Sequence, residues 1–242
     1  MTSTRTPSRP GQLRQRAGSR TPGVHPWVMK PFEPGRACVE GMALVPSWPL
    51  LLGGRAREAH PVLVIPGLGG GNVWTVPLRT TLTSLRYQVH GIRPKSQRGL
   101  PGRVVEAFAE RIEELATEHG QPISIVAWSV GGAYARQAAL MRAPRVRQLI
   151  TLGSPLDGPW YTRRASGAQG LLPFPTTAVH SRSDGVYDWR RCLQPEGPQA
   201  ENVEIFSSHV GMSSNPLVLR VITNRLALPA GSWHPYGAGL SA

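Results

Sequence analysis

The sequence is poor in cysteine and in long apolar runs, and both shortages narrow the class of protein. Its 242 residues include two cysteines, Cys38 and Cys192. Two are too few for a disulfide scaffold; one bridge between them is compatible with the count, but reduced thiols are the simpler expectation. The longest apolar runs have the length of a strand and fall well short of the roughly 18 residues that a membrane-spanning helix needs. We therefore expect no transmembrane segment, and nothing in the pattern indicates an oligomeric state.

Acidic residues are also scarce. Against 27 Lys and Arg the chain has 14 Asp and Glu, for a formal net charge of +13. An excess of this kind raises nucleic acid or an acidic membrane surface as partners. Here the basic residues are almost all arginines scattered along the chain, which favours genome composition plus a basic tail as the explanation. We expect no specific nucleic-acid partner.

The beginning of the chain lacks acids and apolar runs together. Residues 1–35 are rich in Arg, Ser, Thr, Pro and Gly, and Glu33 is the first acidic residue. Such a segment cannot bury enough apolar surface to offset its ordering entropy, so we predict a disordered basic tail over 1–35 and one globular domain over 36–242. The tail shows no apolar core of a secretory signal. The expected location is cytoplasmic, with export or association with a membrane surface left open.

Short apolar runs alternate with amphipathic segments throughout the domain. This order implies parallel βαβ crossovers. We predict an α/β fold with a doubly wound, mostly parallel sheet of about six strands, in which ligands bind at the carboxyl ends of the strands. The expected strands cover 61–66, 87–92, 123–128, 146–152, 177–181 and 202–206, and the expected helices include 74–85, 104–118 and 216–226.

One of these runs passes through a serine directly into a helix. Residues 123–128 form a largely apolar run with three β-branched residues, Ser129 follows, and small residues open the helix behind it. A serine at such a turn is held in a strained backbone conformation, and small neighbours are needed because strand and helix nearly touch. Ser129 therefore has the pattern of a nucleophile elbow, with Ala127 where a glycine is usual. A buried turn serine is the competing interpretation.

A glycine-rich turn follows the first predicted strand, and two chemistries use such a turn. Dinucleotide binding requires a third glycine where this chain has Asn72, and an acidic residue at the end of the next strand, where it has Arg93. With Lys95 and Arg98 nearby, only an NADP phosphate remains as an alternative. The other chemistry is an oxyanion hole, which combines an N–H of this turn with one from the residue after a serine nucleophile. Ser129 lies where that interpretation needs it.

A serine nucleophile needs a base, and the base needs an orienting carboxylate. Of the three aspartates, Asp184 directly follows a predicted strand, whereas Asp188 fits a surface or capping residue and Asp157 lies in a loop. Among seven histidines, only His209 lies in a loop of small residues between a strand and a helix. We predict a catalytic triad of Ser129, Asp184 and His209.

Four segments together resemble a bacterial lipase/esterase-like branch of the α/β-hydrolase superfamily, in its minimal form: 66–70, 127–132, 180–189 and 208–212. The resemblance spans about residues 36–228. It implies that Ser129 is the nucleophile, His209 the general base and then acid, and Asp184 its orienter. It also implies that the backbone N–H groups of Leu68 and Val130 form the oxyanion hole, and that no metal or cofactor is needed.

The reaction implied by this resemblance is hydrolysis of a carboxylic ester, from a small molecule or a lipid, through an acyl-enzyme. Amide or thioester hydrolysis and acyl transfer to another alcohol use the same residues, and no stretch of the sequence discriminates among them. A binding module without catalysis is disfavoured because all three triad positions are occupied.

The stretch 155–176 is the only insertion large enough to roof the site. It is rich in Pro and Gly and carries several apolar side chains. We predict a short lid-like segment whose side chains either line an acyl pocket or cover the core. A roof this short favours short-to-medium acyl chains. The candidate substrate-binding residues are Trp128, Trp160, Leu171, Leu172 and Phe174.

Overall fold

The computed structural model describes residues 25–237 except 57, 59, 68, 95 and 158–169. In this part of the chain, six parallel strands form one sheet in the order β2-β1-β3-β4-β5-β6. The strands β1 and β3 are buried along their whole length, which explains why every residue in them except Ser124 is apolar. The predicted parallel sheet is confirmed. Its strands are β1 (Pro61–Ile65), β2 (Gln88–Gly91), β3 (Ile123–Trp128), β4 (Val146–Leu152), β5 (Thr176–His180) and β6 (Ala200–Glu204).

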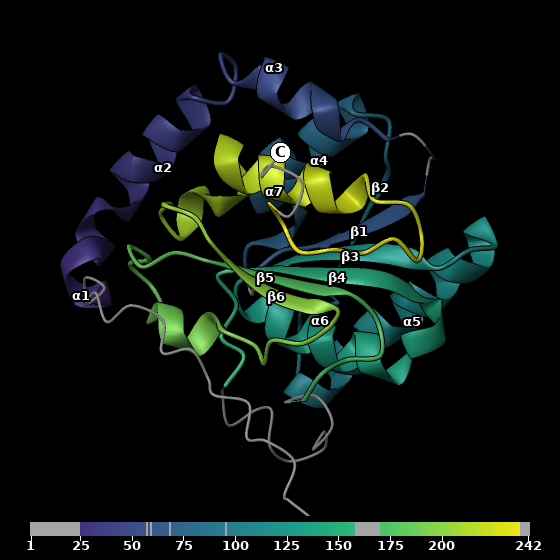
Figure 1. The fold of residues 1–242 in the computed structure, drawn as a ribbon. Helices are drawn as coiled ribbons and strands as arrows, with labels where there is room; N and C mark the ends of the chain where they lie inside the picture. Colours follow the sequence, from purple (N-terminus) through teal and green to yellow (C-terminus); the bar gives the residue numbers. More distant parts are fainter. Residues whose placement is uncertain are drawn as a thin grey trace, which may run out of the picture.

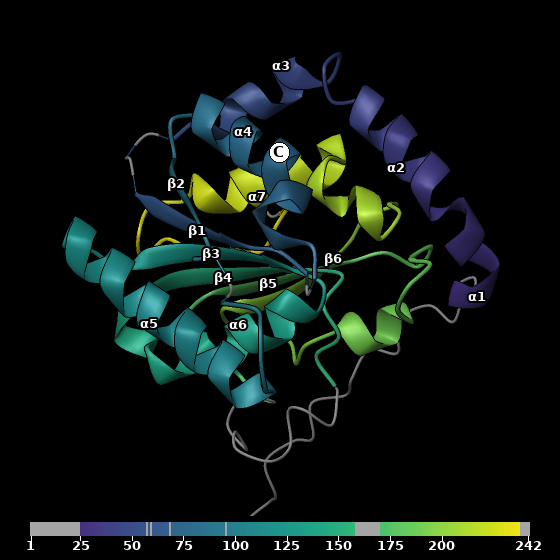
Figure 2. The ribbon, with the colours of Figure 1, turned by 180° about the vertical axis from the view of Figure 1, so that it is seen from behind.

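Helices cover both faces of the sheet (Figure 1). One face packs against α5 (Pro101–His119) and α6 (Val130–Met141) in one core cluster. The opposite face packs against α3 (Trp48–Leu51), α4 (Val76–Ser84) and α7 (Pro216–Leu226) in a second cluster, and Figure 2 shows the same two layers from behind. The doubly wound architecture is therefore as predicted. Single turns of 3-10 helix connect these elements: η1 (Lys30–Phe32), η2 (Leu52–Gly54), η3 (Gly71–Thr75), η4 (Ala143–Arg145), η6 (Trp189–Cys192) and η7 (Val210–Ser213).

The amino-terminal segment differs from the prediction. Where a disordered tail was expected up to residue 35, the structure has α1 (Pro26–Met29), η1 and the start of α2 (Glu33–Met42). Figure 1 shows α1 and α2 at the edge of the molecule, beside the loops that come after β5 and β6. The low apolar content misled the prediction because α2 is held by hydrogen bonds of charged side chains, described below. The remainder of the predicted tail, 1–24, lies outside the described residues.

Two further observations concern the described ranges only. No helix in them combines the length and the apolarity that crossing a membrane requires. Cys38 and Cys192 are both free thiols, the first exposed on α2 and the second buried. Burial raises the pKa of the Cys192 thiol well above its usual value, and the nearby carboxylate of Asp184 adds to this. A buried thiol in such surroundings is unreactive.

Candidate active site

Ser129 lies at the sharp turn between β3 and α6. Its backbone has φ 58° and ψ −143°. Residues other than glycine rarely adopt this combination, and where they do it is typically at functional sites. The small residues after it are required by close contact, because a Cβ on Gly131 would lie 2.2 Å from the carbonyl oxygen of Pro66. The Ser129 N–H donates to the carbonyl of Leu152 on the neighbouring strand at 2.8 Å. The turn predicted for Ser129 is thus present with the strain that an elbow needs.

His209 and Asp184 meet Ser129 at the carboxyl edge of the sheet. Ser129 follows β3, Asp184 comes after β5 and His209 after β6, and the carboxyl ends of parallel strands share one edge. His209 Nε2 lies 3.0 Å from Ser129 Oγ, and His209 Nδ1 lies 2.7 Å from Asp184 Oδ2. These two distances are within hydrogen-bonding range for a nucleophile, a base and its orienter. The structure therefore brings the three predicted triad residues together.

The second carboxylate oxygen of Asp184 is also occupied. Oδ1 accepts the backbone N–H groups of Val186 and Tyr187 at 2.7 and 2.8 Å. Only 2% of Asp184 is exposed, so its charge is held by hydrogen bonds in place of water. The two alternative aspartates serve elsewhere: Asp188 accepts the N–H of Arg190 as the cap of η6, and Asp157 pairs with Arg191.

A pocket of about 260 Å³ is lined by Ser129 and His209. One wall is the glycine-rich turn after β1, and Gly67 in that turn is so close to Ser129 that a Cβ would lie 3.1 Å from the serine Cβ. Val130 is the first residue of α6, and the first amides of a helix have no acceptor within it. Leu68, the other predicted oxyanion donor, lies outside the described residues. The lining residues are Gly67, Gly69, Gly70, Trp74, Trp128, Ser129, His209 and Val210.

Among the predicted substrate-binding residues that the structure describes, only Trp128 lines this pocket. Its indole Nε1 donates to the His209 carbonyl at 3.1 Å, and its ring lies 5.7 Å from the imidazole. The prediction is wrong for Leu172 and Phe174. Both belong to the core cluster that contains α5 and α6, where their apolar surface is buried. Leu171 is half exposed and lies against Gly197. Trp160 lies outside the described residues.

Tyr187 is a residue of the site that sequence reasoning missed. Its ring meets the His209 imidazole edge to face at 5.4 Å. Burial raises the pKa of the Tyr187 phenol, and a hydrogen bond with Ser129 opposes part of that rise. The hydroxyl therefore stays protonated beside the serine. Its position three residues after Asp184 was the available signal.

Two glutamates of α2 were missed as well. Glu33 and Glu40 accept hydrogen bonds from the backbone of the loops that carry Asp184 and His209. The sequence placed Glu33 in a tail and assigned Glu40 no role. Within the described ranges, no group of three His, Cys, Asp or Glu side chains is arranged to hold a metal ion.

Comparison with known proteins shows the fold. No family model and no curated protein matches the sequence. Lipase B from Aspergillus fumigatus matches with a TM-score of 0.61 and 16% identity, over 74% of this chain and 55% of its own; this chain thus spans about half the length of that lipase.

Two other solved structures match along most of their length. Naproxen esterase from Bacillus subtilis has a TM-score of 0.52 at 12% identity, over 77% of this chain and 97% of its own. An α/β hydrolase enzyme from a lagoon-sediment metagenome has a TM-score of 0.52 at 20% identity, over 70% of this chain and 90% of its own. The chain therefore has the α/β-hydrolase fold, which confirms the predicted fold class.

Proposed function

We propose that this protein is a serine hydrolase that cleaves carboxylic esters. One observation carries the proposal: the unbroken hydrogen-bonded series from Ser129 Oγ through His209 to Asp184 Oδ2, with distances of 3.0 and 2.7 Å, at the mouth of a pocket. The strained backbone of Ser129 supports it, since strain of this kind concentrates at functional sites. The esterases and lipases with the same fold are consistent with this activity.

In the proposed reaction Ser129 Oγ attacks the ester carbonyl while His209 Nε2 accepts its proton. Asp184 stabilises the imidazolium through Nδ1, and backbone N–H groups of Val130 and Leu68 hold the oxyanion. The imidazolium then gives its proton to the departing alcohol, which leaves the acyl group on Ser129. Water attacks the acyl-enzyme in the second half, gives one proton to His209, and the acid is released as Ser129 regains that proton.

The proposed substrates are esters of short-to-medium acyl chains. The pocket at Ser129, about 260 Å³, is smaller than the roughly 300–1,000 Å³ of pockets that enclose drug-sized ligands. Because a longer chain would leave its further methylenes in water, it gains little of the roughly 0.8 kcal/mol that each buried methylene supplies. We expect kcat/KM to peak at short-to-medium chains in a series from acetate to palmitate esters. A steady rise to palmitate, with a jump above the solubility limit, would contradict this.

The activity is tested with a short p-nitrophenyl ester and a fluorophosphonate probe. Wild-type protein is expected to hydrolyse the ester and to be labelled at Ser129, as located by mass spectrometry. Ser129→Ala is expected to lower kcat by about 10⁴- to 10⁶-fold, whereas Ser84→Ala, a change at an exposed serine of α4, leaves it unchanged. Labelling at another residue, or equal rates for wild type and Ser129→Ala, would overturn the proposal.

A further inference from the structure

One carboxylate of the helix α2 reaches both of the loops that carry Asp184 and His209. Glu33 Oε1 accepts the N–H of Gly185 at 2.8 Å, and Glu33 Oε2 accepts the N–H of Val210 at 2.9 Å. Gly185 follows Asp184 in the chain and Val210 follows His209. Glu33 therefore joins the two loops at positions directly next to the acid and the base.

A second carboxylate of α2 holds the other side of His209. Glu40 Oε1 accepts the N–H of Ser208 at 2.6 Å, and Oε2 accepts the hydroxyl of Ser207 at 2.7 Å. Between the two glutamates, Arg36 donates to the carbonyl and the hydroxyl of Ser183, each at 2.7 Å. Together the three side chains contact the residues before and after His209 and on both sides of Asp184.

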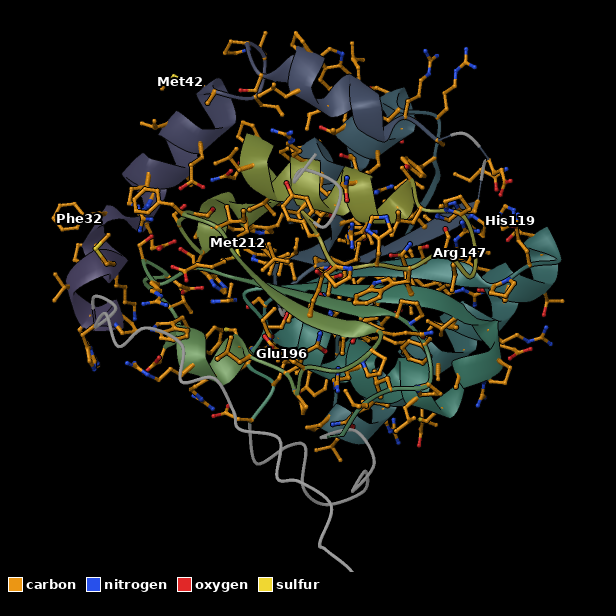
Figure 3. All side chains as sticks on the ribbon, viewed as in Figure 1. Phe32, Met42, His119, Arg147, Glu196 and Met212 are labelled. Atoms are coloured by element: carbon orange, nitrogen blue, oxygen red, sulfur yellow. The ribbon has the colours of Figure 1, made fainter. Side chains whose placement is uncertain are left out.

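These contacts, and not apolar packing, attach α2 to the domain. Glu33 is its one buried residue, while Val39 and Met42 are 61% and 69% exposed. The outward position of Met42 is visible in Figure 3. A buried carboxylate is tolerated only when its oxygens are hydrogen-bonded, and each oxygen of Glu33 has a backbone donor.

The opposing loop is shaped to receive this carboxylate. A Cβ on Gly185 would lie 2.8 Å from both Cγ and Oε1 of Glu33, closer than carbon and oxygen atoms pack. Any residue other than glycine at this position would push Glu33 away from the loop. The acid loop and the helix are therefore mutually fitted.

We propose that Glu33 and Glu40 are positioning residues that hold the Asp184 and His209 loops at the separation needed for proton transfer. The inference rests on the proposed hydrolase function for its catalytic meaning. One carboxylate bonded to both loops fixes the spacing between Asp184 Oδ2 and His209 Nδ1, which is 2.7 Å. A misplacement of about 1 Å at a reacting group can lower a rate about 10²-fold, so a tether at this point controls turnover without touching substrate.

The test compares Glu33→Gln and Glu40→Gln with Glu201→Gln. A glutamine keeps the size of the side chain but offers one acceptor oxygen, so at position 33 one of the two backbone N–H groups must face an NH₂ group. Glu201 is the matched control: it is also a buried carboxylate that binds a backbone N–H, that of Tyr236, but it lies near the start of β6, at the far end of the strand from His209.

Two readouts are measured on the full-length protein. Glu33→Gln is expected to lower kcat for a short ester about 10²-fold with KM changed far less, as a misplacement of about 1 Å would, and Glu201→Gln is expected to lower Tm alone. In an Asp184→Asn background the Glu33→Gln change is expected to lower kcat much less. The carboxylate–imidazole geometry that Glu33 maintains no longer contributes to turnover there. Amide exchange followed by mass spectrometry is expected to accelerate in both 183–187 and 207–212 for Glu33→Gln, and in 207–212 alone for Glu40→Gln.

The outcomes separate the two proposals. If Glu33→Gln matches Glu201→Gln in kcat and leaves exchange of both loops unchanged, the positioning role is wrong. If the wild type shows neither hydrolysis nor labelling at Ser129 while exchange responds as stated, the hydrolase proposal falls and the tethering of the two loops stands. A Glu33→Gln cost that is undiminished in the Asp184→Asn background would also overturn the positioning role.

Discussion

The substitution Asp184→Asn isolates the orienting role of the carboxylate, because the structure dictates how the new amide must sit. Asp184 Oδ1 accepts two backbone N–H groups, from Val186 and Tyr187. The amide oxygen of an asparagine must take that place, since turning the NH₂ group toward two N–H donors leaves buried groups unpaired at about 1–3 kcal/mol each. The NH₂ group therefore faces His209 Nδ1.

That orientation forces the wrong tautomer on the histidine. Nδ1 must then accept a hydrogen bond, so the ring proton moves to Nε2, the atom that lies 3.0 Å from Ser129 Oγ. An Nε2 that already carries a proton cannot take one from the serine. We expect kcat to fall about 10⁴-fold, which corresponds to about 5.4 kcal/mol at 1.36 kcal/mol per decade. Because each polar group keeps a partner, Tm is expected to change little.

The assay is hydrolysis of a short p-nitrophenyl ester together with a thermal melt. Asp188→Asn is the control, because Asp188 is half exposed and caps η6 through the N–H of Arg190. It is expected to keep nearly full activity. An Asp184→Asn enzyme with more than about a tenth of the wild-type kcat, set against the expected loss, or an equal loss in Asp188→Asn, would refute the reasoning.

Two further predictions concern stability. Gly153→Ala places a Cβ 3.1 Å from His209 Nδ1 at a φ of +50°, so we expect the free energy of unfolding to fall by about 1–3 kcal/mol and kcat to fall as well. Gly120→Ala is the control: its φ is +62° and its Cβ would have no atom within 4 Å, so it should lower Tm and leave kcat intact. Burial, and then the positive charge of Arg147, lowers the pKa of His60 from 6.5 to about 4. Between these pH values the unfolded state binds the proton and the folded state does not, so the free energy of unfolding falls by about 3 kcal/mol as the pH drops from 6.5 to 4. Denaturant titrations from pH 4 to 6.5 measure how the free energy of unfolding depends on pH, and this dependence should become weaker in His60→Gln. An unchanged pH dependence in His60→Gln would show that His60 is not its source.

The fold and the meeting of Ser129, Asp184 and His209 were predictable because their signals are local. A buried parallel strand needs a continuous apolar run, and such a run is visible before Ser129 without knowledge of its neighbours. The order of strands then places the ends of β3, β5 and β6 at one edge of the sheet. A polar residue in the loop just after a strand, such as Asp184 or His209, is therefore a candidate for that edge from the sequence alone.

The direction in which an apolar side chain of a loop points, toward the site or toward the core, was harder to predict from the sequence. Leu172 and Phe174 were candidates for an acyl pocket, with covering of the core as the alternative, and both pack into the core with α5 and α6. Their segment has no periodicity that distinguishes the direction toward the site from the direction toward the core. Both environments select apolar residues, so composition alone cannot separate them. Trp128 does line the pocket at Ser129, because it directly precedes that residue in the chain.

The role of α2 lay beyond sequence reasoning for a different reason. Glu33 is 152 residues from Gly185 and 177 from Val210, and hydrogen bonds over such separations leave no pattern in a single sequence. A rule that apolar residues drive packing also assigns this helix to the surface, since its apolar side chains do face outward. The remaining signal is the spacing of Glu33, Arg36 and Glu40, which lie on one face of a helix in a chain with few acidic residues. In this chain the charged side chains on that face of α2 bind the backbone of the loops that contain Asp184 and His209.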